Sequence, residues 1–220
     1  MLHLGLTKMG QRRMRDYSKF DEHYAELLKD IYEQPNDEGH SRMAEEIISK
    51  WMPGLREIKN VLDVGCGTGF CSQYFKNYGV EYLGIAVGTP SIFPLIFNLD
   101  YNFTDFSDET YDLIFSRHSL EHSPFPLLTL MEWHRIAKKY LMLILPEPES
   151  YTYVGKNHYS VMNPRQIKWL LRRSGWEIFS KDYSEPTEMR YLCIKRPRLG
   201  SEGYVEILDA DTLGKDQAFE

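Results

Sequence analysis

Cysteine is scarce in this chain of 220 residues, where only Cys66, Cys71 and Cys193 occur. Their spacing matches neither a metal-ligand pattern nor a disulfide framework, which favours a reducing compartment. No apolar run approaches the roughly 18 residues that span a bilayer. Residues 1–10 do not have the pattern of a secretory signal. These absences predict a cytoplasmic protein with no membrane partner.

An excess of positive charge is also missing, because 26 lysines and arginines face 32 acidic residues and give a net charge of −6. A net acidic chain is not a typical nucleic-acid binder. Short basic runs near Arg12 and Arg172 leave RNA binding open. The length and the 42% hydrophobic content fit one globular domain of ordinary size.

Strand and helix patterns alternate from Val61 onward. This alternation predicts an α/β fold with a doubly wound, mostly parallel sheet that binds ligands at the carboxyl ends of its strands. We expect an N-terminal helical cap over residues 1–56, a core over 57–196 and an acidic, flexible tail over 197–220. The expected strands are 61–64, 82–85, 97–99, 111–116, 140–145, 177–183 and 188–195. The expected helices are 17–33, 41–51, 68–78, a short one after Pro90, 126–138 and 164–174, the last capped by Asn163 and ended by Gly175.

The most informative segment is Val61-Leu62-Asp63-Val64-Gly65-Cys66-Gly67-Thr68-Gly69-Phe70. An apolar strand runs into a turn with three glycines, where a ligand can approach the backbone closely. The spacing is G-x-G-x-G, not the G-x-G-x-x-G of dinucleotide sites. An acid two residues before the first glycine suits a ligand that carries an ammonium and a sulfonium better than a pyrophosphate. The segment favours S-adenosylmethionine (SAM) over NAD; the alternative is a turn whose glycines serve only packing.

Four places resemble the class I SAM-dependent methyltransferases, especially the branch that acts on small molecules. The resemblance covers roughly residues 60–195. It rests on the glycine segment, on Asp100 with residues 111–114, on Ser116-Arg117-His118-Ser119-Leu120-Glu121-His122, and on His158-Tyr159 before Asn163-Pro164. It implies a Rossmann-like, seven-stranded sheet whose last strand is antiparallel, with SAM as cofactor.

The same resemblance implies the cofactor contacts. Residues of the glycine turn line the amino-acid end of SAM, the end of the second strand faces the ribose, and the acid after the third strand holds the adenine. The segment after the fourth strand runs beneath the methionine portion. In order along the chain, the implied residues are Asp63, Gly65, Cys66, Gly67, Gly69, Ile85, Ala86, Asp100, Tyr101, Ser116, Arg117 and His118.

Ala86 departs from the family pattern, which places an acid there to bind both ribose hydroxyls. A hydrogen bond to a charged group contributes about 1.5–3 kcal/mol, so its loss weakens SAM binding roughly tenfold to a hundredfold if nothing replaces it. Three explanations stay open. Another side chain or a water reaches the ribose, the cofactor binds weakly, or the site has lost catalysis or holds a different ligand.

Histidines supply the candidate catalytic groups. The sulfonium already makes the methyl group electrophilic, so the transfer needs alignment and needs a base only where the acceptor must lose a proton. His118 and His122 follow the fourth strand and His158 follows the fifth; each has the alternative of a hydrogen bond to a loop carbonyl. His118-x-x-Glu121-His122 also matches a zinc-peptidase pattern. That pattern requires both histidines on one helix face, whereas here it directly follows a strand, so we expect no metal.

The acceptor class follows from missing motifs. No Asn-Pro-Pro-Tyr, Asp-Pro-Pro-Tyr or Pro-Cys element follows the fourth strand, and this disfavours the DNA amino and cytosine C5 enzymes. We expect direct displacement of the methyl group to an O, N or C atom of a small molecule, with residues 147–159 as the candidate substrate loop. The alternatives are an RNA or nucleotide methyltransferase and a catalytically weak or inactive SAM-binding scaffold. The oligomeric state is left open.

Overall fold

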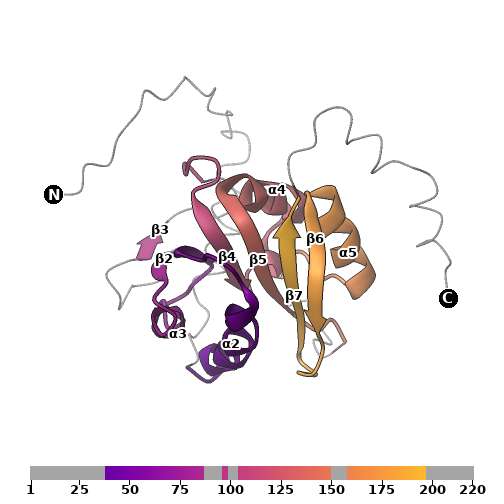
Figure 1. The fold of residues 1–220 in the computed structure, drawn as a ribbon. Helices are drawn as coiled ribbons and strands as arrows, with labels where there is room; N and C mark the ends of the chain where they lie inside the picture. The colour runs from indigo at the N-terminus through magenta and orange to yellow at the C-terminus, as the bar shows by residue number, and fades with distance from the viewer. Residues whose placement is uncertain (1–37, 87–95, 99–103, 150–157, 197–220) are drawn as a thin grey trace.

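The computed structural model describes residues 38–86, 96–98, 104–149 and 158–196 (Figure 1). The helix expected over 17–33, the short helix after Pro90 and the tail over 197–220 lie outside these ranges. So do Asp100 and Tyr101 and most of the candidate substrate loop.

The core is a seven-stranded sheet in the order β3-β2-β1-β4-β5-β7-β6 (Figure 1). Strands β3, β2, β1, β4 and β5 run parallel, whereas β7 is antiparallel to both of its neighbours. The predicted fold class is confirmed, including the antiparallel last strand. The strands are β1 Asn60–Val64, β2 Glu81–Ala86, β3 Ile96–Asn98, β4 Tyr111–Arg117, β5 Ala137–Pro146, β6 Trp176–Asp182 and β7 Glu188–Lys195.

Helices cover both faces of the sheet and bury its central strands (Figure 1). Trp133 of α4 and Leu171 of α5 join the core on one face, while Ile47 of α2 and Phe75 of α3 join the core on the other. The helices are α2 Glu38–Trp51, α3 Ser72–Lys76, α4 Pro126–Ile136 and α5 Pro164–Arg173, with 3₁₀ turns η1 Met52–Gly54 and η2 Leu120–His122. Within the described ranges, no helix is long and apolar enough to cross a membrane.

The caps predicted for α5 are confirmed. The Asn163 side chain accepts a hydrogen bond from the Gln166 N–H at 3.0 Å, and the Gln166 side chain accepts one from the Asn163 N–H at 2.9 Å. This reciprocal pair is a capping box. Gly175 follows the helix with φ +93°, a conformation that glycine adopts without a Cβ penalty.

Several predicted helix boundaries differ from the structure: α2 begins at Glu38 rather than at residue 41 and α3 ends at Lys76 rather than at residue 78, and two further differences have a structural cause. The helix expected over 126–138 ends at Ile136, and β5 begins at Ala137 because this residue pairs with Tyr111 of β4. Sheet pairing therefore overrides the helix-compatible lysines that follow. The helix expected from Thr68 begins at Ser72, because Gly69 with φ +81° extends the turn by several residues.

Candidate functional site

The glycine turn lies at the carboxyl edge of the sheet, between β1 and α3. Gly65, Gly67 and Gly69 have φ values of +74°, +54° and +81°, a region that residues with a Cβ rarely adopt. The carbonyl of Ile85 at the end of β2 accepts hydrogen bonds from the N–H groups of Gly65 at 2.8 Å and Cys66 at 3.1 Å. The turn is thereby fixed against the end of β2.

Gly65 also allows the segment after β4 to approach the turn. A Cβ at this position would lie 1.8 Å from the Ser119 Oγ. The Ser119 hydroxyl is held there by donating to the Val64 carbonyl at 3.1 Å. The turn after β1 and the segment after β4 are therefore in direct contact, and this contact depends on glycine.

Asp63 lies beneath the turn rather than on its surface, since the residue is 2% exposed. Its carboxyl accepts a hydrogen bond from the Tyr82 hydroxyl at 2.6 Å. Burial raises the pKa of Asp63 to about 7, although the Tyr82 hydroxyl and the Arg117 charge act to lower it. The carboxyl is thus poised between its neutral and ionised forms near neutral pH. A cation bound above the turn would stabilise the ionised form.

Two features of this edge suit a cofactor with many polar groups. The Ser116 hydroxyl, at the end of β4 beside Val64, is buried and has no hydrogen-bond partner among the described residues. Ile85 and Ala86 end β2 and are both buried. The residues predicted to contact the adenine, Asp100 and Tyr101, lie outside the described residues.

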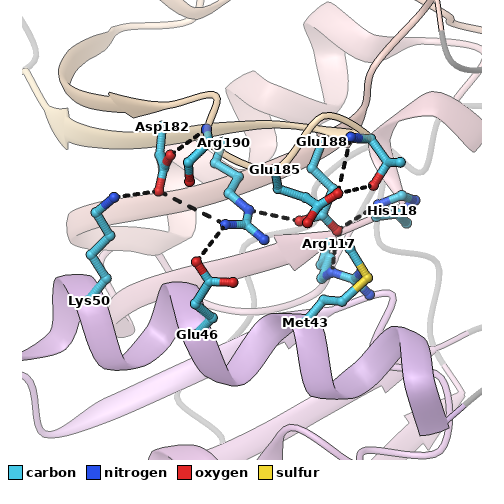
Figure 2. A network of polar contacts seen from close by, with 11 residues as sticks. Met43, Glu46, Lys50, Arg117, His118, Asp182, Glu185, Glu188 and Arg190 are labelled. Atoms are coloured by element: carbon cyan, nitrogen blue, oxygen red, sulfur yellow. Dashed lines mark hydrogen bonds and ion pairs between the residues drawn. The ribbon is translucent and has the colours of Figure 1, made fainter.

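The side chains of Arg117 and His118 point toward Glu188 of β7 (Figure 2). The Arg117 Nε donates to Glu188 at 2.8 Å, and the His118 Nε2 lies 3.1 Å from the same carboxylate oxygen. His118 has φ +50°, an uncommon value for a residue other than glycine. The segment after β4 therefore supplies the Ser119 hydroxyl to the turn and the side chains of Arg117 and His118 to a buried charge cluster.

Glu188 is the centre of this cluster, which sequence reasoning did not identify. It is 1% exposed, and it also accepts a hydrogen bond from the Arg190 Nε at 2.8 Å. Burial acts to raise the pKa of Glu188, but the His118 hydrogen bond and the charge of Arg117 outweigh it and lower the pKa to about 2. The only sequence signal was a Glu-x-Arg pair on one face of an otherwise apolar strand.

The cluster continues to α2 through Arg190, which is fully buried (Figure 2). The Arg190 Nη1 lies 3.6 Å from Glu46 and 3.9 Å from Asp182, and the Lys50 Nζ lies 2.6 Å from Asp182. These ion pairs join α2 to β6 and β7. They fix the described part of the predicted N-terminal cap against the ligand edge of the sheet.

The structure brings two of the three predicted catalytic histidines together. The rings of His122 and His158 pack edge to face with centroids 4.7 Å apart. The contact is supported by the backbone, because the Ser160 N–H donates to the Glu121 carbonyl at 2.9 Å. Burial lowers the pKa of His158 below its usual range. His118 belongs instead with Glu188, although its Nδ1 also lies 3.7 Å from Glu121.

Glu121 lies in η2 beside this histidine pair and is 1% exposed. Burial raises the pKa of Glu121 to about 8, against a smaller opposing effect of the Arg117 charge. In the sequence, Glu121 belongs to the segment that resembles the family and is the acid of a zinc-peptidase motif, but neither pattern assigns it a role of its own. Its burial next to two histidines depends on the contact between η2 and the segment that begins at His158.

Comparisons with known proteins match this geometry. A family model described as a methyltransferase domain matches residues 22–181, more than half of the chain. No curated protein is significantly similar in sequence. A SAM-dependent methyltransferase from Archaeoglobus fulgidus is similar in structure, with a TM-score of 0.57 and 17% identity over 70% of this chain and 94% of that chain.

Two further solved structures share the fold. The PH0226 protein from Pyrococcus horikoshii gives a TM-score of 0.60 at 14% identity, over 79% of this chain and 99% of that one. The Burkholderia thailandensis 1,6-didemethyltoxoflavin-N1-methyltransferase was solved with 1,6-didemethyltoxoflavin and S-adenosylhomocysteine. It gives 0.61 at 16% identity, over 87% of this chain and 94% of that one. With the glycine turn and the seven-stranded sheet, the family match shows that this chain belongs to the class I SAM-dependent methyltransferases and uses SAM as its cofactor.

Proposed function

We propose that the chain transfers the methyl group of SAM to a small-molecule acceptor by direct displacement. The main support is the likeness to the Burkholderia 1,6-didemethyltoxoflavin-N1-methyltransferase, which was solved with bound 1,6-didemethyltoxoflavin. The match covers 87% of this chain and 94% of that one.

The proposed cofactor contacts divide along the carboxyl edge of the sheet. Asp63 and the turn from Gly65 to Gly69, including Cys66 and Gly67, hold the methionine end, assisted by Ser116 and by the backbone of residues 117–118. Ile85 and Ala86 border the ribose. Asp100 and Tyr101 are proposed for the adenine from the sequence resemblance alone.

The proposed acceptor contacts are His122 and His158, with His118 as a positioning residue. SAM supplies the electrophilic methyl group, so the chain must align the acceptor and exclude water from it. His122 is 6% exposed and packs against His158, and the two follow the adjacent strands β4 and β5. His118 is held by Glu188 and fixes the backbone on which His122 stands.

Ala86 favours a second candidate, a module that binds SAM without turning it over. The residue ends β2 and is 4% exposed. Its methyl side chain cannot accept a hydrogen bond from the ribose hydroxyls. A chain with weak SAM affinity and no detectable transfer would have this role.

Labelled SAM separates these candidates. The purified chain is incubated with methyl-labelled SAM and a cell extract divided into low-mass, RNA and protein fractions. We expect label in the low-mass fraction, with S-adenosylhomocysteine as the second product. Label confined to RNA would instead support the nucleic-acid reading. Calorimetric binding of SAM without transfer to any fraction would support the binding module.

A further inference from the structure

Glu121, His122 and His158 form a cluster whose chemistry the proposed methyl transfer does not require. Each offers one ligand atom, and the three atoms all lie within 4.8 Å of one another. Two imidazole nitrogens and one carboxylate oxygen are a usual donor set for Zn²⁺ and other divalent transition metals, and three protein ligands leave a coordination position open.

The environment of the Glu121 carboxyl is the second observation. Both of its oxygens are buried and have no hydrogen-bond partner among the described residues. The imidazole nitrogens of His118 and His122 lie 3.7 and 4.0 Å from its Oε1, beyond hydrogen-bond distance. A buried carboxylate without donors is costly, and a cation placed between it and the histidines would remove that cost.

The backbones that carry the three side chains are already fixed. Glu121 and His122 belong to η2, whose end is closed by the Ser123 N–H donating to the Leu120 carbonyl at 3.0 Å. The Ser160 N–H donates a hydrogen bond to the Glu121 carbonyl, and the Ser160 hydroxyl donates one to the Ser123 carbonyl at 2.5 Å. Metal–ligand bonds of about 2 Å place tetrahedral ligand atoms roughly 3.3 Å apart. The ligand atoms, which lie within 4.8 Å of one another, must therefore approach one another by up to about 1.5 Å to bind the metal.

We propose that Glu121, His122 and His158 bind a divalent transition metal of the zinc class, with an open position that accepts an oxygen or nitrogen ligand. The site differs from the zinc-peptidase pattern, because His118 is engaged by Glu188 and His158 takes its place. The metal site itself does not depend on methyl transfer. Only its further role, holding an acceptor atom in the open position, rests on the proposed function.

The test measures metal binding on the full chain after treatment with a chelator. Calorimetry with Zn²⁺ is expected to show one ion per chain. Co²⁺ is expected to give a visible absorption spectrum of nitrogen and oxygen ligands without a thiolate band. His158→Gln and Glu121→Gln should each weaken binding more than about a hundredfold, since even outer partners of metal ligands typically cost 10–100-fold. His118→Gln is the matched control, because the His118 Nδ1 lies 3.7 Å from Glu121 and a glutamine amide can still donate to Glu188 and keep the segment in position; this variant should retain binding.

Binding of S-adenosylhomocysteine by each variant shows that it is folded and tests the cofactor site separately. The metal proposal is overturned if the wild-type chain binds no stoichiometric Zn²⁺ or Co²⁺, if a thiolate band appears, or if His118→Gln loses as much affinity as His158→Gln. Should one variant fail to fold, the other decides. Loss of metal binding with S-adenosylhomocysteine binding intact leaves the methyltransferase assignment standing.

Discussion

Replacing Asp63 by asparagine is expected to stabilise the ligand-free protein above pH 7 and to lower its affinity for SAM. Asp63 is 2% exposed and has the Tyr82 hydroxyl as its hydrogen-bond donor at 2.6 Å. An asparagine oxygen can accept the same hydrogen bond. The substitution therefore removes an ionisable group from the core and leaves the local contacts in place.

The magnitude follows from the pKa of this carboxyl, which burial raises from 3.8 to about 7. Below pH 3.8 the group is protonated in both states and contributes nothing. Between the two values the unfolded chain ionises and the folded chain does not, so the free energy of unfolding falls as the pH rises. The pKa values of Asp63 in the folded and unfolded states differ by about three pH units, and one pH unit corresponds to about 1.4 kcal/mol. Above pH 7 the free energy of unfolding is therefore lower by about 4 kcal/mol.

Urea denaturation at several pH values between 4 and 8 measures this effect. Asp63→Asn should match the wild type near pH 4 and exceed it by up to about 4 kcal/mol at pH 8. Asp112→Asn is the control, because that buried carboxylate accepts the Lys59 N–H at 2.8 Å and faces the Lys138 Nζ at 3.5 Å; it should lose stability instead. A pH-independent difference, or a less stable Asp63→Asn at pH 8, would refute the reasoning. Calorimetry should also show that the affinity for SAM falls by about tenfold or more. This result would indicate that the buried carboxylate lowers stability but serves cofactor binding.

Three further perturbations address other parts of the site. Gly65 has φ +74°, and a Cβ there would lie 1.8 Å from the Ser119 Oγ, so Gly65→Ala should abolish SAM binding in calorimetry. Gly79 has φ +68° and no atom within 4 Å of the position of a Cβ, so Gly79→Ala should only lower the thermal midpoint. Ala86→Asp should tighten SAM binding about tenfold through a new ribose contact, and unchanged affinity would mean the slot is misassigned. Glu188→Gln should lower the free energy of unfolding by about 3 kcal/mol at pH 7, because the pKa of Glu188 is lowered to about 2 in the folded protein. In urea denaturation, the difference between variant and wild type should disappear as the pH falls from 4.5 toward 2.

Features set by neighbouring residues were predictable from the sequence. The positive φ values of the glycine turn, the Asn163 capping box and the antiparallel pairing of β6 with β7 all follow from local patterns. The end of α4 did not, because the helix stops where Ala137 finds a strand partner in Tyr111. A residue 26 positions earlier in the chain decides that boundary, and periodicity carries no record of it.

The charge cluster shows the same limit more sharply. Arg117 and Glu188 are separated by 71 positions, and Lys50 and Asp182 by 132. Each residue alone is compatible with a solvated surface position. Only the order of the strands, which places β7 beside β5 and under α2, turns these charges into a buried network.

The histidine cluster lies between these two cases. The His118-x-x-Glu121-His122 pattern requires both histidines on one helix, but η2 covers only Leu120–His122 and His118 precedes it with φ +50°. The two histidines of the pattern therefore do not share a helix face. His158 follows β5, and β5 pairs directly with β4. Residues that follow adjacent parallel strands meet at one sheet edge, so topology, rather than spacing along the chain, selects His158 as the partner of Glu121 and His122.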